Sequence, residues 1–468
     1  MQTFSDIPRY YTCAIPSCTQ PAIRCRRCAV CKKHRCARHE ARRYHYCPSD
    51  GEISDEDWNK RIADEVADIL AKLNIPALLD LAQSLNDNKL CVFEPGQYSP
   101  PSASIMGGTN YHAWLIFEDG ERWLLRTPRV GLDLVPPDVF EYIVTSEYAT
   151  LKFLETTSIP APRAFSFGLS SDPANKLGID YLLIQALPGR PYKRGDATLG
   201  QSNHVLEQIA DMMIKLSQLP FSAAGSLITS SEGNTKIGPV SSNRFIHLYP
   251  SGPHNSPTDY FADTARQYLD LIADGQLHER CPVEAYLFYS LLLSRSEELS
   301  PKAGAATDMD ALHSRFFLKH VDDKDDHLLV DDDHNITGII DWQSARIVPA
   351  IEAFGPSILT SDLDRLVSGK GGLTQDDRKL ADALRSRGHE GLAQCVEVGD
   401  LVRTFMFGPD ADSSPAQARA FLGNMLPRLG IHAKVDQWIQ EQQELFKKTE
   451  KGRKVLSKIQ ELLDLQKE

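Results

Sequence analysis

The chain has 468 residues, of which 42% are apolar and 24% are charged, and it carries a formal net charge of −12. This length allows two or three domains with separate cores, and the composition is that of a soluble globular protein. No run of about 18 apolar residues occurs, which excludes a membrane-spanning helix. The segment from Met1 to Thr12 lacks the apolar stretch of a secretory signal, so we expect a cytoplasmic or nuclear protein.

The charge is unevenly distributed along the chain. Residues 1–47 contain ten Lys or Arg against two acidic residues, a formal charge of +8, so the remainder carries about −20 by difference. A basic head on an acidic body suggests that the two parts bind different partners.

Seven of the ten cysteines fall between Cys13 and Cys47, interspersed with three histidines. In a reducing compartment this density favours metal binding over disulfides. The ligands form four pairs: Cys13 with Cys18, Cys28 with Cys31, Cys36 with His39, and His45 with Cys47. Zinc takes four such ligands in a tetrahedron, so eight suit two zinc ions, with alternate pairs sharing each ion. Cys25 and His34 are surplus, and a shifted pairing through Cys25 and Cys28 is an alternative.

The spacing from Cys31 to Cys47 resembles the cross-brace zinc finger of stress-associated, ubiquitin-pathway proteins, although the opening Cys13-x4-Cys18 pair is wider than in that family. A segment this poor in large apolar residues needs metal in order to fold. Cross-brace fingers more often bind proteins, so the resemblance implies a protein partner at this zinc-binding module (residues 1–50) rather than nucleic acid.

The next elements alternate between helix and strand signals. Residues 51–85 show apolar residues at helical spacing and form a predicted helical connector. Residues 111–126 alternate apolar and polar around Asp119-Gly120, which is typical of a hairpin, and 146–155 and 181–184 predict a helix and a buried strand. We interpret residues 86–188 as a small α+β lobe.

Beyond residue 188 the pattern becomes mainly helical. Helices are predicted at 203–218, 258–274, 282–298 and 376–405, residues 222–257 are expected to be loop, and a strand hairpin is expected over 328–340. Residues 189–440 would form a large helical lobe. The C-terminal helix, residues 441–468, should pack on the body through its apolar stripe.

Acidic residues lie at both ends of the predicted 328–340 hairpin. Asp322 precedes it in the segment beginning Lys319-His320-Val321, and Asp341 follows it in Ile340-Asp341-Trp342. Phosphoryl transfer requires a carboxylate that positions the attacking hydroxyl, metal ions on the phosphate oxygens, and a phosphate-binding cation. Two carboxylates brought together by a tight hairpin suit this chemistry.

This pattern resembles the aminoglycoside-phosphotransferase and choline-kinase family, relatives of protein kinases, from about residue 85 to residue 430. The resemblance implies a bilobal protein-kinase-like α+β fold and ATP-dependent transfer to a hydroxyl of an unidentified acceptor. It assigns proton acceptance to Asp322, with His320 in the same catalytic motif, and metal binding to Asp341. In the small lobe it places Gly107 and Gly108 over the phosphates.

The resemblance also places Arg126 at the phosphate-binding lysine position and Glu147 as its helix partner. It assigns adenine contacts to the backbone of Gln185 and Leu187. Two departures matter. Arg126 replaces lysine, a planar fork replacing a point charge, and His327 replaces a metal-binding asparagine.

Magnesium prefers oxygen ligands, so Asp325 or Asp326 could substitute for His327, or manganese could serve. Otherwise that metal site is lost. The main alternative function is a pseudokinase scaffold that docks proteins through the zinc-binding module.

Overall fold

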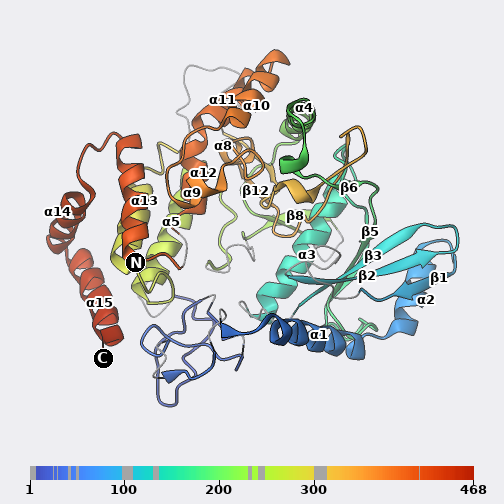
Figure 1. The fold of residues 1–468 in the computed structure, drawn as a ribbon, viewed down its shortest axis with the longest axis horizontal. Helices are drawn as coiled ribbons and strands as arrows, with labels where there is room; N and C mark the ends of the chain where they lie inside the picture. The colour runs from blue at the N-terminus through green and yellow to red at the C-terminus, as the bar shows by residue number, and fades with distance from the viewer. Residues whose placement is uncertain are drawn as a thin grey trace.

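The computed structural model describes residues 7–24, 26–28, 30–40, 44–48, 52–96, 109–129, 136–229, 234–240, 248–299, 312, 314–409 and 412–467. Figure 1 shows a sheet-rich small lobe on one side and a larger helical lobe on the other. This arrangement confirms the predicted α+β, bilobal, protein-kinase-like fold class.

The small lobe is built on a five-stranded antiparallel sheet of order β1-β2-β3-β5-β4. Its strands are β1 (Cys91–Glu94), β2 (Asn110–Phe117), β3 (Arg122–Pro128), β4 (Ala164–Gly168) and β5 (Tyr181–Gln185). The helices α1 (Asp55–Lys72), α2 (Ile75–Leu85) and α3 (Pro137–Leu154) accompany the sheet.

The predicted hairpin is the centre of this sheet. Alternate residues of β2 are buried, and the Asp119-Gly120 turn pairs Leu115 with Trp123 and His112 with Arg126. Gly120 adopts φ +86°, a left-handed conformation that glycine tolerates best. The hairpin therefore fixes Arg126 near the far end of β3.

The helical connector packs on the small lobe. Val66 and Ile69 of α1 and Leu78 of α2 are buried with Leu115 and other sheet residues in one apolar cluster. The side chain of Ser54 caps α1 by accepting from the Asp57 backbone N–H, and acidic residues fill the first turn, where the helix dipole favours them.

The large lobe contains most of the helices. They are α4 (Leu199–Ser217), α5 (Pro257–Ala273), α6 (Pro282–Ser294), α8 (Ala350–Ala353), α9 (Leu363–Val367), α10 (Gln375–Ser386), α11 (Glu390–Val398), α12 (Asp400–Phe407), α13 (Pro415–Arg428), α14 (Val435–Lys447) and α15 (Glu450–Lys467). Short strands join them: β6 (Arg190–Pro191), β7 (Ser226–Thr229), β8 (Thr235–Gly238), β9 (Phe316–Lys319), β10 (Leu328–Val330), β11 (Ile336–Ile339) and β12 (Arg346–Pro349). Two short 3₁₀ turns, η5 (Arg194–Asp196) and η6 (Asp325–His327), lie in the same lobe.

Two sequence predictions for this lobe were wrong in detail. The stretch 222–257, expected to be loop, contains the β7–β8 hairpin. The stretch 376–405, expected to be continuously helical, is α10, α11 and α12, separated at Gly388 and Gly399. Gly388 has φ +82°, a left-handed conformation that cannot continue a helix. Glycine is common directly after a helix because it adopts this conformation without a steric penalty.

The large-lobe core lies between α5, α6 and α13, where Phe261, Phe288 and Leu422 are fully or almost fully buried. The C-terminal apolar stripe packs on this core through Trp438 and Ile459, as the sequence predicted, but as two helices. None of the described helices combines the length and apolar character needed to cross a membrane.

Candidate functional site

Arg126 connects side chains of the two lobes. Its guanidinium is buried and forms ion pairs with Glu147 of α3 and with Asp341, which follows β11. Its Nη2 also donates to Gln343 Oε1 at 2.8 Å. The structure therefore brings together three predicted site residues, Arg126, Glu147 and Asp341, from three separate elements.

Asn110 and Gln343 belong to the same group, and sequence reasoning missed both. The Asn110 amide oxygen, when it faces Arg126, accepts from Nε at 3.1 Å and Nη2 at 2.8 Å. A signal was available in each case, because Asn110 follows the glycine-bearing segment and Gln343 lies two residues after Asp341. Both accept hydrogen bonds from the same guanidinium that pairs with the two carboxylates.

The segment before the β10–β11 hairpin supplies Asp322, His320 and His327. His327 Nδ1 donates to the Asp322 backbone carbonyl at 2.7 Å, and its Nε2 lies 3.4 Å from Asp341 Oδ2. One ligand atom each from Asp322, His327 and Asp341 lies within 4.8 Å of the others. His320 does not join this cluster directly; its Nε2 donates to the Ile340 carbonyl at 2.8 Å, and it supports the segment that carries Asp341.

Asp341 occupies an unusual backbone conformation. Its φ is +61°, in the left-handed region that costs a residue with a side chain about 1 kcal/mol or more. Neighbouring hydrogen bonds hold it there: Ile340 N–H donates to the His327 carbonyl at 2.9 Å, and Trp342 Nε1 donates to the Ile339 carbonyl at 2.8 Å. This backbone directs the carboxylate towards Arg126 and His327.

The electrostatics of the group leave room for a cation. Burial acts to raise the pKa of Asp341, but Arg126 and His327 hold that pKa well below its usual range. Burial raises the pKa of Glu147 to about 7, against the opposing effect of Arg126. One guanidinium thus pairs with two carboxylates and stabilises the ionised form of Asp341 more than that of Glu147. The ionised Asp341 carboxylate is a suitable ligand for a metal ion.

The residues predicted to contact adenine end β5. The Gln185 backbone N–H donates to the Arg163 carbonyl at 2.9 Å, and the Ala186 N–H donates to the Arg122 carbonyl at 3.1 Å. The Leu187 N–H donates to no backbone carbonyl within the described part of the chain. Gly107 and Gly108 lie outside the described residues.

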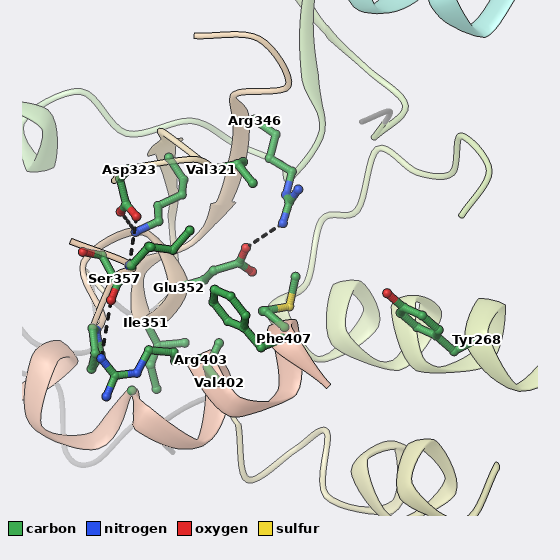
Figure 2. A pocket seen from close by; sticks show the side chains of 15 residues that line it. Tyr268, Val321, Asp323, Arg346, Ile351, Glu352, Ser357, Val402, Arg403 and Phe407 are labelled. Carbon is green, nitrogen blue, oxygen red and sulfur yellow. Dashed lines mark hydrogen bonds and ion pairs between the residues drawn. The ribbon is translucent and has the colours of Figure 1, made fainter. Parts of the chain in front are cut away.

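A cavity of about 170 Å³ lies behind the loop that carries Asp322. Figure 2 shows Glu352 reaching towards Arg346, with which it pairs at 3.0 Å, while Asp323 faces the same space. Asp323 pairs with Lys319 at 2.8 Å and accepts the Ile358 backbone N–H at 3.0 Å. Through these two contacts Asp323 fixes the loop to the cavity wall. The neighbouring Asp322 instead belongs to the cluster with Asp341.

The N-terminal cysteines and histidines form two further clusters. Within each, one ligand atom per residue lies within 4.8 Å of the others: Cys13, Cys18, Cys36 and His39 in one, and Cys28, Cys31, His45 and Cys47 in the second. Alternate pairs thus meet, and all eight are free thiols or imidazoles. His34 lies outside both clusters and stacks on Tyr11 with ring centroids 3.9 Å apart, and Cys25 is outside the described residues.

Comparison with known proteins identifies the family of this chain, whereas the similar solved structures have low sequence identity to it. The profile of the APH phosphotransferase enzyme family matches residues 106–363, more than half of the chain. A macrolide 2′-phosphotransferase from Brachybacterium faecium is 17% identical, with 78% of this chain and 96% of that chain covered and a TM-score of 0.38. For a putative aminoglycoside phosphotransferase from Ralstonia eutropha these values are 12%, 84%, 97% and 0.43.

An ethanolamine kinase from Plasmodium vivax is 12% identical, with 80% of this chain and 82% of that chain covered and a TM-score of 0.38. Among curated proteins, no match was found.

Proposed function

Because this chain belongs to the phosphotransferase enzyme family, we propose that it transfers the terminal phosphoryl group of ATP to a hydroxyl of a small-molecule acceptor. The observation that carries the proposal is the convergence of Arg126, Glu147 and Asp341 beside Asp322. These residues supply the phosphate-binding cation, its partner, a metal-binding carboxylate and a proton acceptor, which are the parts that phosphoryl transfer requires.

Asp322 would accept the proton of the acceptor hydroxyl as its oxygen bonds to the γ-phosphorus and the bond to the β–γ bridging oxygen breaks. Arg126 would bind phosphate oxygens while Glu147 keeps its guanidinium oriented. The Leu187 backbone N–H would contact the adenine, whereas the Gln185 N–H already donates to the Arg163 carbonyl. The acceptor itself is unidentified.

Asp341 and His327 would hold a divalent ion, and Asp322 lies within reach of the same position. The carboxylate of Asp341 and the imidazole of His327 can both ligate a divalent metal, and the imidazole suits manganese better than magnesium. Bound there, the ion would neutralise charge on the phosphate oxygens. Arg126 and the ion would share Asp341, so the present Arg126–Asp341 pair must loosen when metal and nucleotide enter.

The test separates catalysis from nucleotide binding. Asp322→Asn should eliminate turnover and leave ATP affinity nearly unchanged, since Asp322 acts on the hydroxyl. Asp332→Asn is the matched control, because Asp332 is an exposed carboxylate in the turn of the adjoining β10–β11 hairpin. The assay is slow ATP hydrolysis, or transfer to a panel of hydroxyl compounds, with magnesium and with manganese.

If wild type binds ATP but neither it nor any variant turns over, the alternative holds and the protein is a pseudokinase. His327 at the metal position is the observation that favours this alternative. A wild type whose melting temperature does not respond to ATP and metal would contradict both functions.

We also propose that the two cysteine–histidine clusters each bind a zinc ion. Three thiolates and one imidazole per cluster match the ligand preference of structural zinc. The Cys13 sulfur lies 3.2 Å from His39 Nδ1, and the Cys31 sulfur 3.6 Å from His45 Nε2, close to the separation of two ligands on one tetrahedral ion. Elemental analysis of protein purified without added metal should find about two zinc ions per chain; none would reject the proposal.

A further inference from the structure

The basic N-terminal segment contacts the large lobe of its own chain. Arg9 donates to both oxygens of Asp274, from Nε at 2.9 Å and from Nη2 at 2.7 Å. Asp274 ends α5, and its side chain is fully buried. A bidentate pair to a buried carboxylate is a specific contact rather than a loose attraction between opposite charges.

Arg24 makes the second contact, at the same corner of the lobe. Its backbone N–H donates to the Gln276 carbonyl, and its Nε donates to Gln276 Oε1, both at 2.9 Å. Its guanidinium lies 3.8 Å from the centre of the Tyr10 ring, and the residue is only 3% exposed. Both the backbone and the side chain of Arg24 are thus hydrogen-bonded to the large lobe.

Arg26 makes the third contact, pairing with Glu279 at 2.7 Å and also with Asp412. Arg24 and Arg26 lie between Cys18 of one zinc cluster and Cys28 of the other. The positions of these arginines therefore depend on the segment that both metal clusters hold in place.

The chain then crosses to the small lobe. Seven residues separate Cys47 from Asp55, the first residue of α1; this helix packs against the sheet and pairs through Glu65 with Arg129 at 2.8 Å. Figure 1 shows the N-terminal segment beneath the large lobe and α1 running from it to the small lobe. Eight peptide steps span at most about 28 Å, so this link is short, and it joins the lobes independently of the chain crossing at residues 185–189.

We propose that the zinc-binding module is an intramolecular strap: its docking partner is the α5–α6 corner of its own large lobe, and its metal-loaded fold limits the spacing of the two lobes. The sequence predicted different partners for the basic and acidic parts, but these three arginines of the basic part contact the acidic part of their own chain. Resting on the proposed function, the consequence is catalytic. Arg126 and Asp341 come from different lobes, so loss of zinc loosens the nucleotide site and raises KM for ATP.

The test uses the full chain with a charge reversal and its rescue. Arg26→Glu should raise hydrogen exchange of residues 274–281 by about tenfold or more, because two like charges then oppose each other across a desolvated contact. It should increase the radius of gyration in solution scattering and raise KM for ATP several-fold. Combining Arg26→Glu with Glu279→Arg should restore all three towards wild type.

Lys33→Glu is the matched control, since Lys33 is an exposed residue of the same module. It should change none of these readouts, and zinc content should stay at two ions in every variant. Chelation of wild type should reproduce Arg26→Glu without any substitution.

If Arg26→Glu and chelation both leave exchange at 274–281 unchanged, the module is not docked and the strap is rejected. If exchange rises while the scattering radius stays constant, the module docks but does not set lobe spacing, and that half of the proposal is rejected. Exchange and scattering need no turnover. An inactive wild type would therefore reject the phosphotransferase proposal without changing what these two measurements say about docking and lobe spacing.

Discussion

Replacing Arg126 by methionine should destabilise the small lobe, chiefly because Glu147 then loses its partner. Both side chains are about 6% exposed, whereas Asp341 is 32% exposed and can be solvated when its partner leaves. Breaking a buried ion pair by removing one member costs about 3–5 kcal/mol, because the remaining carboxylate either stays uncompensated or must take up a proton. We expect Arg126→Met to fall in that range near neutral pH.

The cost should depend on pH with a defined sign. Burial already raises the pKa of Glu147 to about 7, and without Arg126 that pKa rises further. The folded state then holds a proton that the unfolded state releases above about pH 4.3, so stability falls as pH rises towards the folded pKa. The destabilisation of Arg126→Met should accordingly be larger at pH 8 than at pH 6.

The double variant Arg126→Met with Glu147→Leu removes both charges and should recover most of the loss, since an apolar pair of similar volume is often no less stable. Urea unfolding can be followed by the fluorescence of buried Trp123, which lies on β3 with Arg126. If Glu147→Leu costs the same in the wild-type and Arg126→Met backgrounds within about 0.5 kcal/mol, the two residues are uncoupled and the reasoning fails.

His327→Asn should raise magnesium-supported turnover relative to manganese-supported turnover, measured as initial rates in each metal; an unchanged ratio would mean that His327 does not touch the ion. Cys28→Ser should lower the zinc content from two ions towards one by elemental analysis, and retention of two would contradict the paired clusters. Gly225→Ala should lower the free energy of unfolding by about 1–3 kcal/mol, because a Cβ would lie 2.2 Å from the Gly238 carbonyl oxygen, whereas Gly195→Ala meets nothing within 4 Å and should be nearly neutral.

Features that depend on neighbouring residues could be predicted from the sequence. Alternation in β2 and the Asp119-Gly120 turn determine a hairpin locally, and the fold class follows from the order of such elements. The β7–β8 hairpin could not be predicted, because its turn-rich surroundings mask two strands of four residues each. The break at Gly388 had a signal that was missed, because residues 385–391 contain two glycines and no apolar side chain.

Contacts between segments that are distant in the sequence could not be predicted from it. The sequence suggested Arg126 and Asp341 by resemblance, but the pairing of Asn110 with Arg126 depends on the β2–β3 register, which places Asn110 opposite Pro128, two residues from Arg126. Similarly, the sequence showed that the N-terminal segment is positively charged, but it did not show which surface that segment contacts. The corner at Asp274 carries no distinctive sequence signal, because its role depends on burial, which the linear chain does not display.

The same corner has a consequence for the order in which the protein can be completed during synthesis. The buried Asp274 carboxylate is met by Arg9 from the beginning of the chain and by Lys458 of α15, 3.2 Å away, from near its end. An incompletely neutralised carboxylate is costly to remove from water. Asp274 therefore gains its second cationic partner only after Lys458, 184 residues further along the chain, has left the ribosome, so docking of α15 follows the synthesis of the helices on which it packs.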